Sequence, residues 1–203
     1  MRLAHIRQKG TFNEPVWHVL VVLTVAIVLQ AALNNQLTFG FKYVIIALEV
    51  VLFVILSTFF LPLAWRRIVA IALLALISVA NMVSLSVVIA ALIGSAQVNG
   101  RELLFSSVVI YLTNVIVFGL WYWELDNQRT NVDDFQFPQR AGETSQRPTF
   151  LDYLYVSITN ASAFSPTDTL PLTHRAKYLM ALQSLTSLAI VVLVTARAVN
   201  ILS

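Results

Sequence analysis

Apolar residues fall into five long runs along the chain, at 15–34, 42–64, 67–94, 103–123 and 176–202. Each run supplies the roughly 20 apolar residues that a helix needs to cross a bilayer. Aromatic residues typical of membrane interfaces lie near several of the run ends, namely Tyr43, Trp65, Trp121, Tyr122 and Trp123. The pattern predicts an all-α integral membrane protein with five transmembrane helices.

Two features modify this simple pattern. The third run contains Asn81 and several serines, which must face protein rather than lipid, and its length predicts a tilt or a kink. Pro62, near the end of the second run, is expected to bend the last turn of that helix.

Composition agrees with a membrane protein and excludes several other classes. The 203 residues are 58% hydrophobic and only 11% charged, which leaves little chain for a soluble domain. There is no cysteine, so disulfides and thiolate metal ligands are excluded. The net charge of +3 is scattered without a basic block, so we expect no nucleic-acid partner.

A polar stretch at 124–148 interrupts the apolar pattern and contains two prolines, which predicts an exposed loop. In such a loop Asp126, Asp133 and Asp134 are interpreted as solvated charges. The next segment opens with Thr149 and Asp152, a pattern that is similar to a capping box with an acidic partner and indicates a helix start.

The segment 149–173 is too short for a span, yet its apolar stretch predicts a helix of about three turns. One interpretation is a re-entrant pore helix and loop, a structure that the membrane tolerates only where protein or a water-filled cavity surrounds it. The other is an amphipathic surface helix followed by a loop. The pattern alone favours neither.

The residues from Ser157 to Thr173 resemble the pore region of tetrameric potassium channels and align with it without a gap. The residues that carry the resemblance are Ser157 and Ala161 of the pore helix, Asp168 after the filter, Pro171, Thr173 and the basic Arg175. The resemblance implies a homotetramer around a shared pore.

The resemblance also divides the chain into two parts. Residues 1–101 form three N-terminal transmembrane helices, and 102–203 form a channel-like pore module. The module consists of an outer helix 103–123, the exposed loop 124–148, a pore helix and filter-like loop 149–173, and an inner helix 174–202.

The filter positions depart from the family. Where potassium channels read Thr-Val-Gly-Tyr-Gly, this chain has Ala163, Phe164, Ser165, Pro166 and Thr167. Both glycines, which permit unusual backbone angles, are absent, and Pro166 has no N–H to donate. We therefore expect no strong preference for potassium.

Asp168 and the last apolar run carry the other expected pore features. Four copies of Asp168 would form an acidic ring that favours monovalent cations. Alternatively, Asp168 caps the neighbouring loop or pairs with Arg175. Residues that share one face of the inner helix are candidates for lining the pore, or for ordinary helix packing; they are Gln183, Ser187, Ile190 and Val194.

Glu49 lies within the second apolar run, and an intramembrane acid is a functional candidate. Asn81 and Arg197 are candidate partners for it, although nothing in the sequence brings them together, and the alternative is that Glu49 lies near the interface. The three histidines lack metal-ligand spacing, and no phosphate-binding loop occurs. We therefore expect no enzyme activity, no cofactor and no metal.

Basic residues cluster at 2–9, 66–67, 129–147 and 175–177, which alternating helices would place on one side. The positive-inside rule then predicts a multi-pass cell-membrane protein with a cytoplasmic N-terminus. The pore loop would also be cytoplasmic, opposite to its side in potassium channels.

Three functions fit these features. The first is a potassium-channel-like protein that acts as a weakly selective cation channel through a tetrameric pore. The second is a non-conducting membrane protein with a relic pore fold, acting as a structural or regulatory partner. The third, a proton- or solute-coupled carrier, rests on Glu49 alone.

Overall fold

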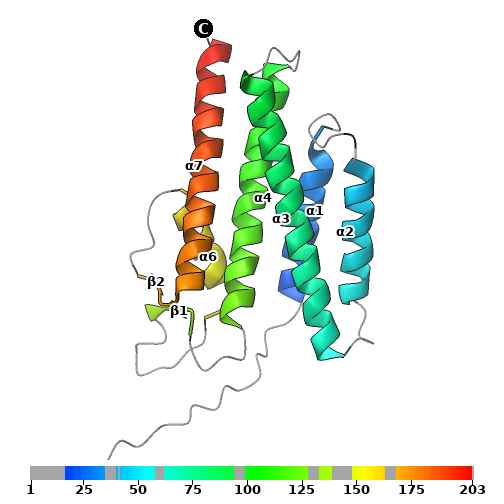
Figure 1. Ribbon diagram of the computed structural model, residues 1–203, viewed down its shortest axis with the longest axis vertical. Helices are drawn as coiled ribbons and strands as arrows, with labels where there is room; N and C mark the ends of the chain where they lie inside the picture. The colour runs from blue at the N-terminus through cyan, green and yellow to red at the C-terminus, as the bar shows by residue number, and fades with distance from the viewer. Residues whose placement is uncertain are drawn as a thin grey trace, which may run out of the picture.

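The computed structural model describes residues 17–34, 40, 42–57, 62–93, 99–127, 133–138, 148–162 and 168–202. These residues are almost entirely helical (Figure 1). In chain order the elements are α1 (Trp17–Ala32), α2 (Lys42–Ser57), α3 (Leu63–Ile93), α4 (Gly100–Asp126), β1 (Phe135–Gln136), α6 (Phe150–Ala161), β2 (Leu170–Pro171) and α7 (His174–Leu202).

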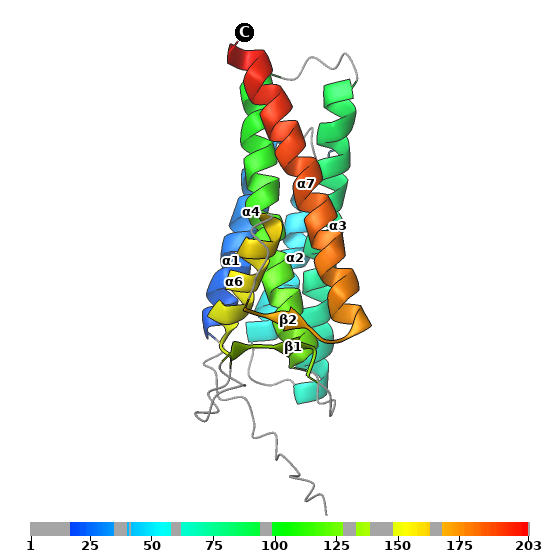
Figure 2. The same cartoon turned by 90° about the vertical axis from the view of Figure 1, so that its left-hand side faces the viewer.

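The long helices form one bundle in which α4 is central. α4 packs on α1, α3, α6 and α7, while α2 packs on α1 and α3. Figures 1 and 2 show α1, α2, α3, α4 and α7 running up and down the bundle in alternation. The start of α1, the end of α2, the start of α3, the end of α4 and the start of α7 therefore share one end of the bundle, which we call the base.

Three helical stretches are long and apolar enough to cross a membrane: Ala64–Leu92, Gly100–Asp126 and His174–Ala196. The chain thus has the character of a helical membrane protein. α1 and α2 have 16 residues each, which is shorter than the usual span of about 20. The expected five full-length spans are therefore supported for three helices.

Pro62 has a different place from the one expected. The Arg66 N–H donates to the Pro62 carbonyl at 3.1 Å, so Pro62 lies at the start of α3. Proline is well tolerated at the start of a helix because its missing N–H would have no partner there. Pro62 therefore precedes α3 and does not bend α2, which ends at Ser57 in the structure.

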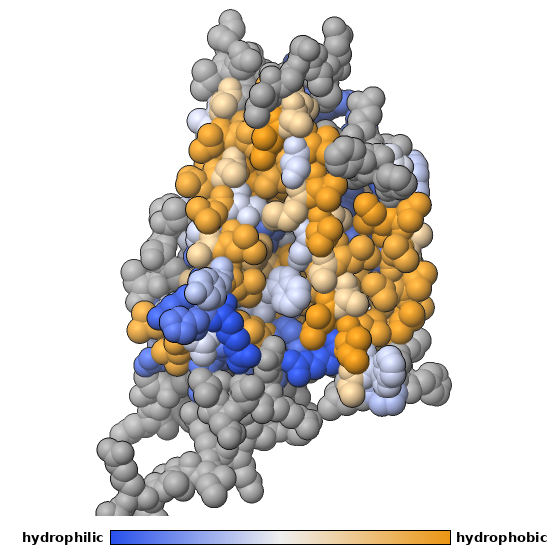
Figure 3. Space-filling model, viewed as in Figure 1, coloured by the Kyte–Doolittle hydropathy of each residue, from blue (hydrophilic) through white to orange (hydrophobic). Residues whose placement is uncertain are grey.

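Buried apolar side chains fill the bundle between α1, α2, α3 and α4, with Ala26, Leu73 and Ile77 fully buried. The outside of the bundle is apolar too, and hydrophilic residues gather toward the base (Figure 3). Val21, Val44, Val79 and Leu185, on four different helices, are all more than half exposed. An apolar exterior over this height suits a protein that is surrounded by lipid.

Candidate functional site

α6 is a short helix that packs on both α4 and α7. It begins near the base and rises to about half the height of the bundle (Figure 2). The chain returns to the base at β2, which pairs antiparallel with β1 in the register Phe135 with Pro171 and Gln136 with Leu170. The segment from α6 to β2 therefore leaves the base and comes back to it.

The start of α6 has the capping arrangement that the sequence predicts. The backbone N–H of Thr149 donates to Asp152 Oδ2 at 2.6 Å, and the Thr149 hydroxyl donates to the same oxygen at 3.0 Å. A carboxylate in the first helical turn satisfies free donors and interacts favourably with the positive end of the helix dipole. This fixes the point where the chain turns upward into the bundle.

Close packing holds α6 against α4. A Cβ atom at Gly119 of α4 would lie 3.3 Å from both Cα and Cδ1 of Leu154. The glycine therefore allows the two helices to approach more closely than a larger residue would. Beside this contact, the Ser157 hydroxyl donates to the Val115 carbonyl of α4 at 2.6 Å.

A buried polar network joins α6 to α7 around Gln183, which has no exposed surface. Gln183 Nε2 donates to the hydroxyl of Ser157 at 2.6 Å and to its carbonyl at 3.1 Å. Gln183 Oε1 accepts from the Tyr122 hydroxyl at 2.5 Å and from Asn160 Nδ2 at 2.8 Å. One side chain of α7 thus links α4 and α6, in surroundings where water is excluded.

The network extends along α7 on both sides of Gln183. The Ser184 hydroxyl donates to Asn160 Oδ1 at 3.0 Å, and Asn160 Nδ2 also donates to the Met180 carbonyl at 3.0 Å. Further along, Asn114 Nδ2 of α4 donates to the Ser187 hydroxyl at 3.0 Å. The polar side chains of α7 in this network therefore form their hydrogen bonds within the chain.

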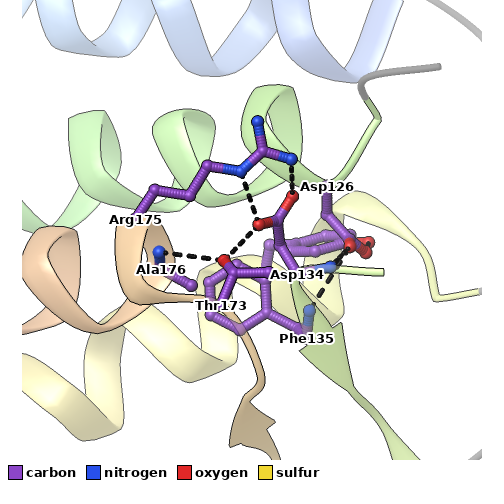
Figure 4. Close-up of polar contacts among 7 residues, drawn as sticks. Asp126, Asp134, Phe135, Thr173, Arg175 and Ala176 are labelled. Atoms are coloured by element: carbon purple, nitrogen blue, oxygen red, sulfur yellow. Dashed lines mark hydrogen bonds and ion pairs between the residues drawn. The ribbon is translucent and has the colours of Figure 1, made fainter. Parts of the chain in front are cut away.

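A second polar cluster closes the base of this arrangement (Figure 4). Asp134 accepts from Arg175 through both carboxylate oxygens, from Nε at 2.8 Å and from Nη2 at 2.8 Å. The Thr173 hydroxyl also donates to Asp134 Oδ1. This two-oxygen pairing fixes the start of α7 to the segment that carries β1.

Asp126, at the end of α4, joins the same region. Its Oδ2 accepts from the Tyr153 hydroxyl of α6 at 2.5 Å, and its Oδ1 accepts from the Asp134 N–H at 2.8 Å. The rings of Phe135 and Phe137 pack around Tyr153, with centroids 6.2 and 4.9 Å away. The end of α4, the β1 segment and α6 therefore form one unit.

These contacts correct the prediction of a wholly exposed loop. Asp126 and Asp134 are buried, at 2% and 0% exposed, and Phe135 and Phe137 are buried with them. The cost of burying the two carboxylates is offset, because each accepts several hydrogen bonds. Asp126 and Asp134 are therefore structural anchors and not solvated charges.

The filter-like positions Ala163, Phe164, Ser165, Pro166 and Thr167 lie outside the described residues. Asp168, the next residue, is exposed. Arg175, the partner considered for it, instead binds Asp134. The structure thus leaves the Asp168 carboxylate on the surface near the base.

The inner-helix face predicted to line a pore is turned inward. Gln183, Ser187 and Ile190 have no exposed surface, and Val194 is partly buried. The exposed residues of α7 are instead mostly apolar, including Leu182, Leu185 and Leu188. Within the chain, Gln183, Ser187 and Ile190 therefore pack against α4 and α6.

Glu49 is fully buried in α2. Within the described part of the chain, neither carboxylate oxygen has a hydrogen-bond partner. A contact with Asn81 is therefore not formed, and Asn81 Nδ2 donates to the Ile110 carbonyl of α4 at 3.2 Å. The side chain of Arg197 lies outside the described residues.

The described side chains include no group of three His, Asp or Glu residues that could hold a metal ion. Comparison of the chain with models of protein families, with characterised proteins and with solved structures found no match. The features of the described residues that bear on function are therefore the arrangement of α4, α6 and α7 and the exposed Asp168.

Proposed function

We propose that residues 102–203 form a pore-loop module and that four copies of the chain assemble into a weakly selective cation channel in a membrane. The observation that supports this most directly is the path of the chain from α6 to β2. It enters the bundle from the base as a half-height helix and returns to the same end. A re-entrant helix and loop have this path.

The burial of α6 favours this interpretation over a surface helix. Phe150, Tyr153, Val156 and Ser157 are all buried, and Ser157 bonds to the backbone of α4. An amphipathic helix lying on a membrane surface would leave its polar face in water. In α6 the polar residues Ser157 and Asn160 instead bond within the bundle.

Two charges favour cations near the filter-like segment. The C-terminal end of α6 carries the partial negative charge of a helix dipole and precedes residues 163–167 directly. Asp168, on the other side of that segment, is exposed. In a tetramer both features would be repeated four times, which raises the local cation concentration.

One observation favours the second candidate, a non-conducting protein with a relic pore fold. The polar face of α7 is used for contacts inside the chain, and the exposed face is mostly apolar. A pathway lined by leucine and valine would resist wetting and so resist ion passage. The two candidates share the same fold and differ only in conduction.

Cation flux from proteoliposomes distinguishes them, with Asp168→Asn as the informative variant. We expect flux of both potassium and sodium, and a several-fold lower flux after Asp168→Asn. The matched control is Glu102→Gln. It neutralises another exposed acid, which lies in the first turn of α4 at the end of the bundle away from the base. No flux from protein that is folded and inserted would favour the relic fold, and a homogeneous monomer would refute the tetramer.

The same proposal includes an orientation, with the base on the cytoplasmic side. Basic residues Arg66, Arg67 and Arg175 lie at the base, where the positive-inside rule requires them. Reporter fusions after residue 135 and at the C-terminus test this directly. We expect the fusion after 135 to report a cytoplasmic position and the C-terminal fusion the opposite side.

A further inference from the structure

Glu49 is buried between three helices without a group that could balance a negative charge. It lies in the middle of α2, which packs on α1 and α3, and its side chain has no exposed surface. Among the described residues, neither of its carboxylate oxygens has a hydrogen-bond partner. An ionised carboxylate in such surroundings is strongly unfavourable, and the group avoids this state by keeping its proton.

The two helices that pack against Glu49 carry their charged residues far from it. In α1 the titratable residue is His18, and in α3 the charged residues are Arg66 and Arg67. All three lie near the start of their helices, at the base, whereas Glu49 lies at mid-height. On α2 itself, Lys42 is about two helical turns away.

A small polar cavity lies on the side of Glu49 that is away from the base. It has a volume of about 10 Å³, lies between α1, α2 and α3, and is lined by the polar residues Gln30, Lys42 and Ser84. Ile46, which lies about one turn before Glu49, also lines it. A cavity of roughly this size with several polar groups can hold one water molecule. Protons can therefore come within about one turn of Glu49 from this side.

The surroundings of Glu49 toward the base are apolar. Leu52 and Leu56 of α2 pack there with Leu23 of α1 and Leu73 of α3 in one core cluster. Moving a charge through apolar surroundings is strongly unfavourable. The packing therefore favours proton exchange from the end of the bundle away from the base.

We propose that Glu49 is a proton-binding site whose carboxyl group is protonated in the folded chain, and that its proton exchanges through the cavity lined by Gln30, Lys42 and Ser84. The ligand is the proton itself, which becomes the hydrogen of the carboxyl O–H and needs no further room. Loss of this proton places a charge between α1, α2 and α3, so the docking of α2 depends on it. The site is independent of ion conduction.

Infrared spectroscopy of the full-length chain in lipid tests the protonation directly. A protonated carboxyl group has a C=O stretching band that is separate from the bands of carboxylates and peptide groups. We expect this band at neutral pH, and we expect Glu49→Gln to remove its contribution. The matched control Glu102→Gln changes an exposed acid of α4 and should leave the band unchanged. Identical carboxyl bands in the unchanged chain and in Glu49→Gln would overturn the proposal.

The pH dependence of folding supplies a second test. In the unfolded chain an exposed glutamate ionises above a pH of about 4.3. The folded chain keeps the proton of Glu49 and so binds one proton more, which means that rising pH favours unfolding. Relative to Glu49→Gln, the ratio of folded to unfolded chain should fall by up to tenfold per pH unit.

Unfolding in mixed micelles of dodecyl sulfate, from about pH 5 to about pH 8, supplies these ratios. Glu49→Leu, which also lacks the carboxyl group, is a second reference. Equal pH dependence of the unchanged chain and both variants would overturn the proposal.

Two variants of the cavity test the route of exchange. Ser84→Val replaces the hydroxyl by a methyl group, and Ala80→Leu fills the cavity. Both should retain the carboxyl band and slow its shift several-fold after transfer into D₂O, while circular dichroism shows that they are folded. The control is Leu56→Met, on the base side of Glu49, which should leave the exchange rate unchanged. Exchange that neither cavity variant slows, or that Leu56→Met slows equally, would overturn the route.

Discussion

Replacing Gln183 by leucine should release α6 from α7, because four hydrogen bonds converge on this side chain. Two run from Nε2 to Ser157, at 2.6 and 3.1 Å, and two arrive at Oε1 from Tyr122 and Asn160, at 2.5 and 2.8 Å. Gln183 and Ser157 have no exposed surface, so water cannot replace the lost bonds.

The size of the effect depends on which partners keep other bonds. Ser157 still donates to the Val115 carbonyl, and Asn160 still donates to the Met180 carbonyl. Tyr122 is fully buried, and its hydroxyl proton loses its acceptor. One orphaned buried donor plus the net loss of the other bonds corresponds to about 2–4 kcal/mol of unfolding free energy.

A double-mutant cycle with Tyr122→Phe isolates the interaction. Tyr122→Phe removes the donor that would be orphaned, so the double variant should be about 1–3 kcal/mol more stable than the sum of the single effects. Unfolding in mixed micelles of increasing dodecyl sulfate fraction, followed by circular dichroism, supplies the free energies. Thr195→Val is the control, since the exposed hydroxyl of Thr195 donates to the Val191 carbonyl of its own helix.

A change in unfolding free energy of less than about 0.5 kcal/mol for Gln183→Leu, as ordinary surface substitutions give, would refute the role of Gln183 in holding α6. Strict additivity in the cycle would refute the contact with Tyr122 specifically. Either result would mean that α6 is held by apolar packing alone.

Three further changes test other contacts by thermal unfolding in detergent. Gly119→Leu should lower the melting temperature, because even a Cβ would lie 3.3 Å from Leu154 and the overpacking costs about 1–3 kcal/mol. In Gly119→Ala a gain in helix propensity offsets part of this cost, so the alanine variant should be the more stable one. Equal stability of the two variants would contradict the close approach of α4 and α6. Asp134→Asn should destabilise the base by about 1–2 kcal/mol, a value moderated by solvent because the Arg175 side chain is 40% exposed, and an unchanged melting temperature would contradict the anchoring role. Glu49→Leu should raise the melting temperature, because it removes a buried carboxyl group with no partner among the described residues, and a clear decrease would show that Glu49 is held by a stabilising contact.

The apolar runs in the sequence predict the helical membrane character because lipid requires a long apolar stretch for every span. They predict α3, α4 and α7 closely. The start of α6 was also predictable, since Thr149 and Asp152 interact locally and need no knowledge of the rest of the fold.

The partners of polar residues could not be predicted in the same way. Helical spacing places Gln183, Ser187 and Ile190 on one face of α7, and this grouping is correct. Spacing does not reveal what that face touches, however, and within the chain the face meets α4 and α6. A face with polar residues at helical spacing suits both a pore lining and helix packing, so the sequence could not decide between the two.

The base shows a second limit of prediction from sequence. The stretch around Asp134 is polar overall, which favours a solvated loop. Its alternation of Phe135 and Phe137 with a polar residue was a signal for a short, half-buried strand, and β1 has this pattern. The burial of Asp134 depends on Arg175, which is distant in sequence, so composition could not predict it.

Reversal potentials in planar bilayers show whether the chain conducts cations. The purified chain should give currents whose reversal potential shifts strongly in a gradient of potassium chloride, with the sign of cation selectivity. Replacing potassium by sodium on one side should shift it little, because the filter positions lack both glycines. Strong selectivity for potassium over sodium would contradict the argument from the filter, and electrical silence from folded, inserted protein at all voltages and pH values would contradict the channel itself.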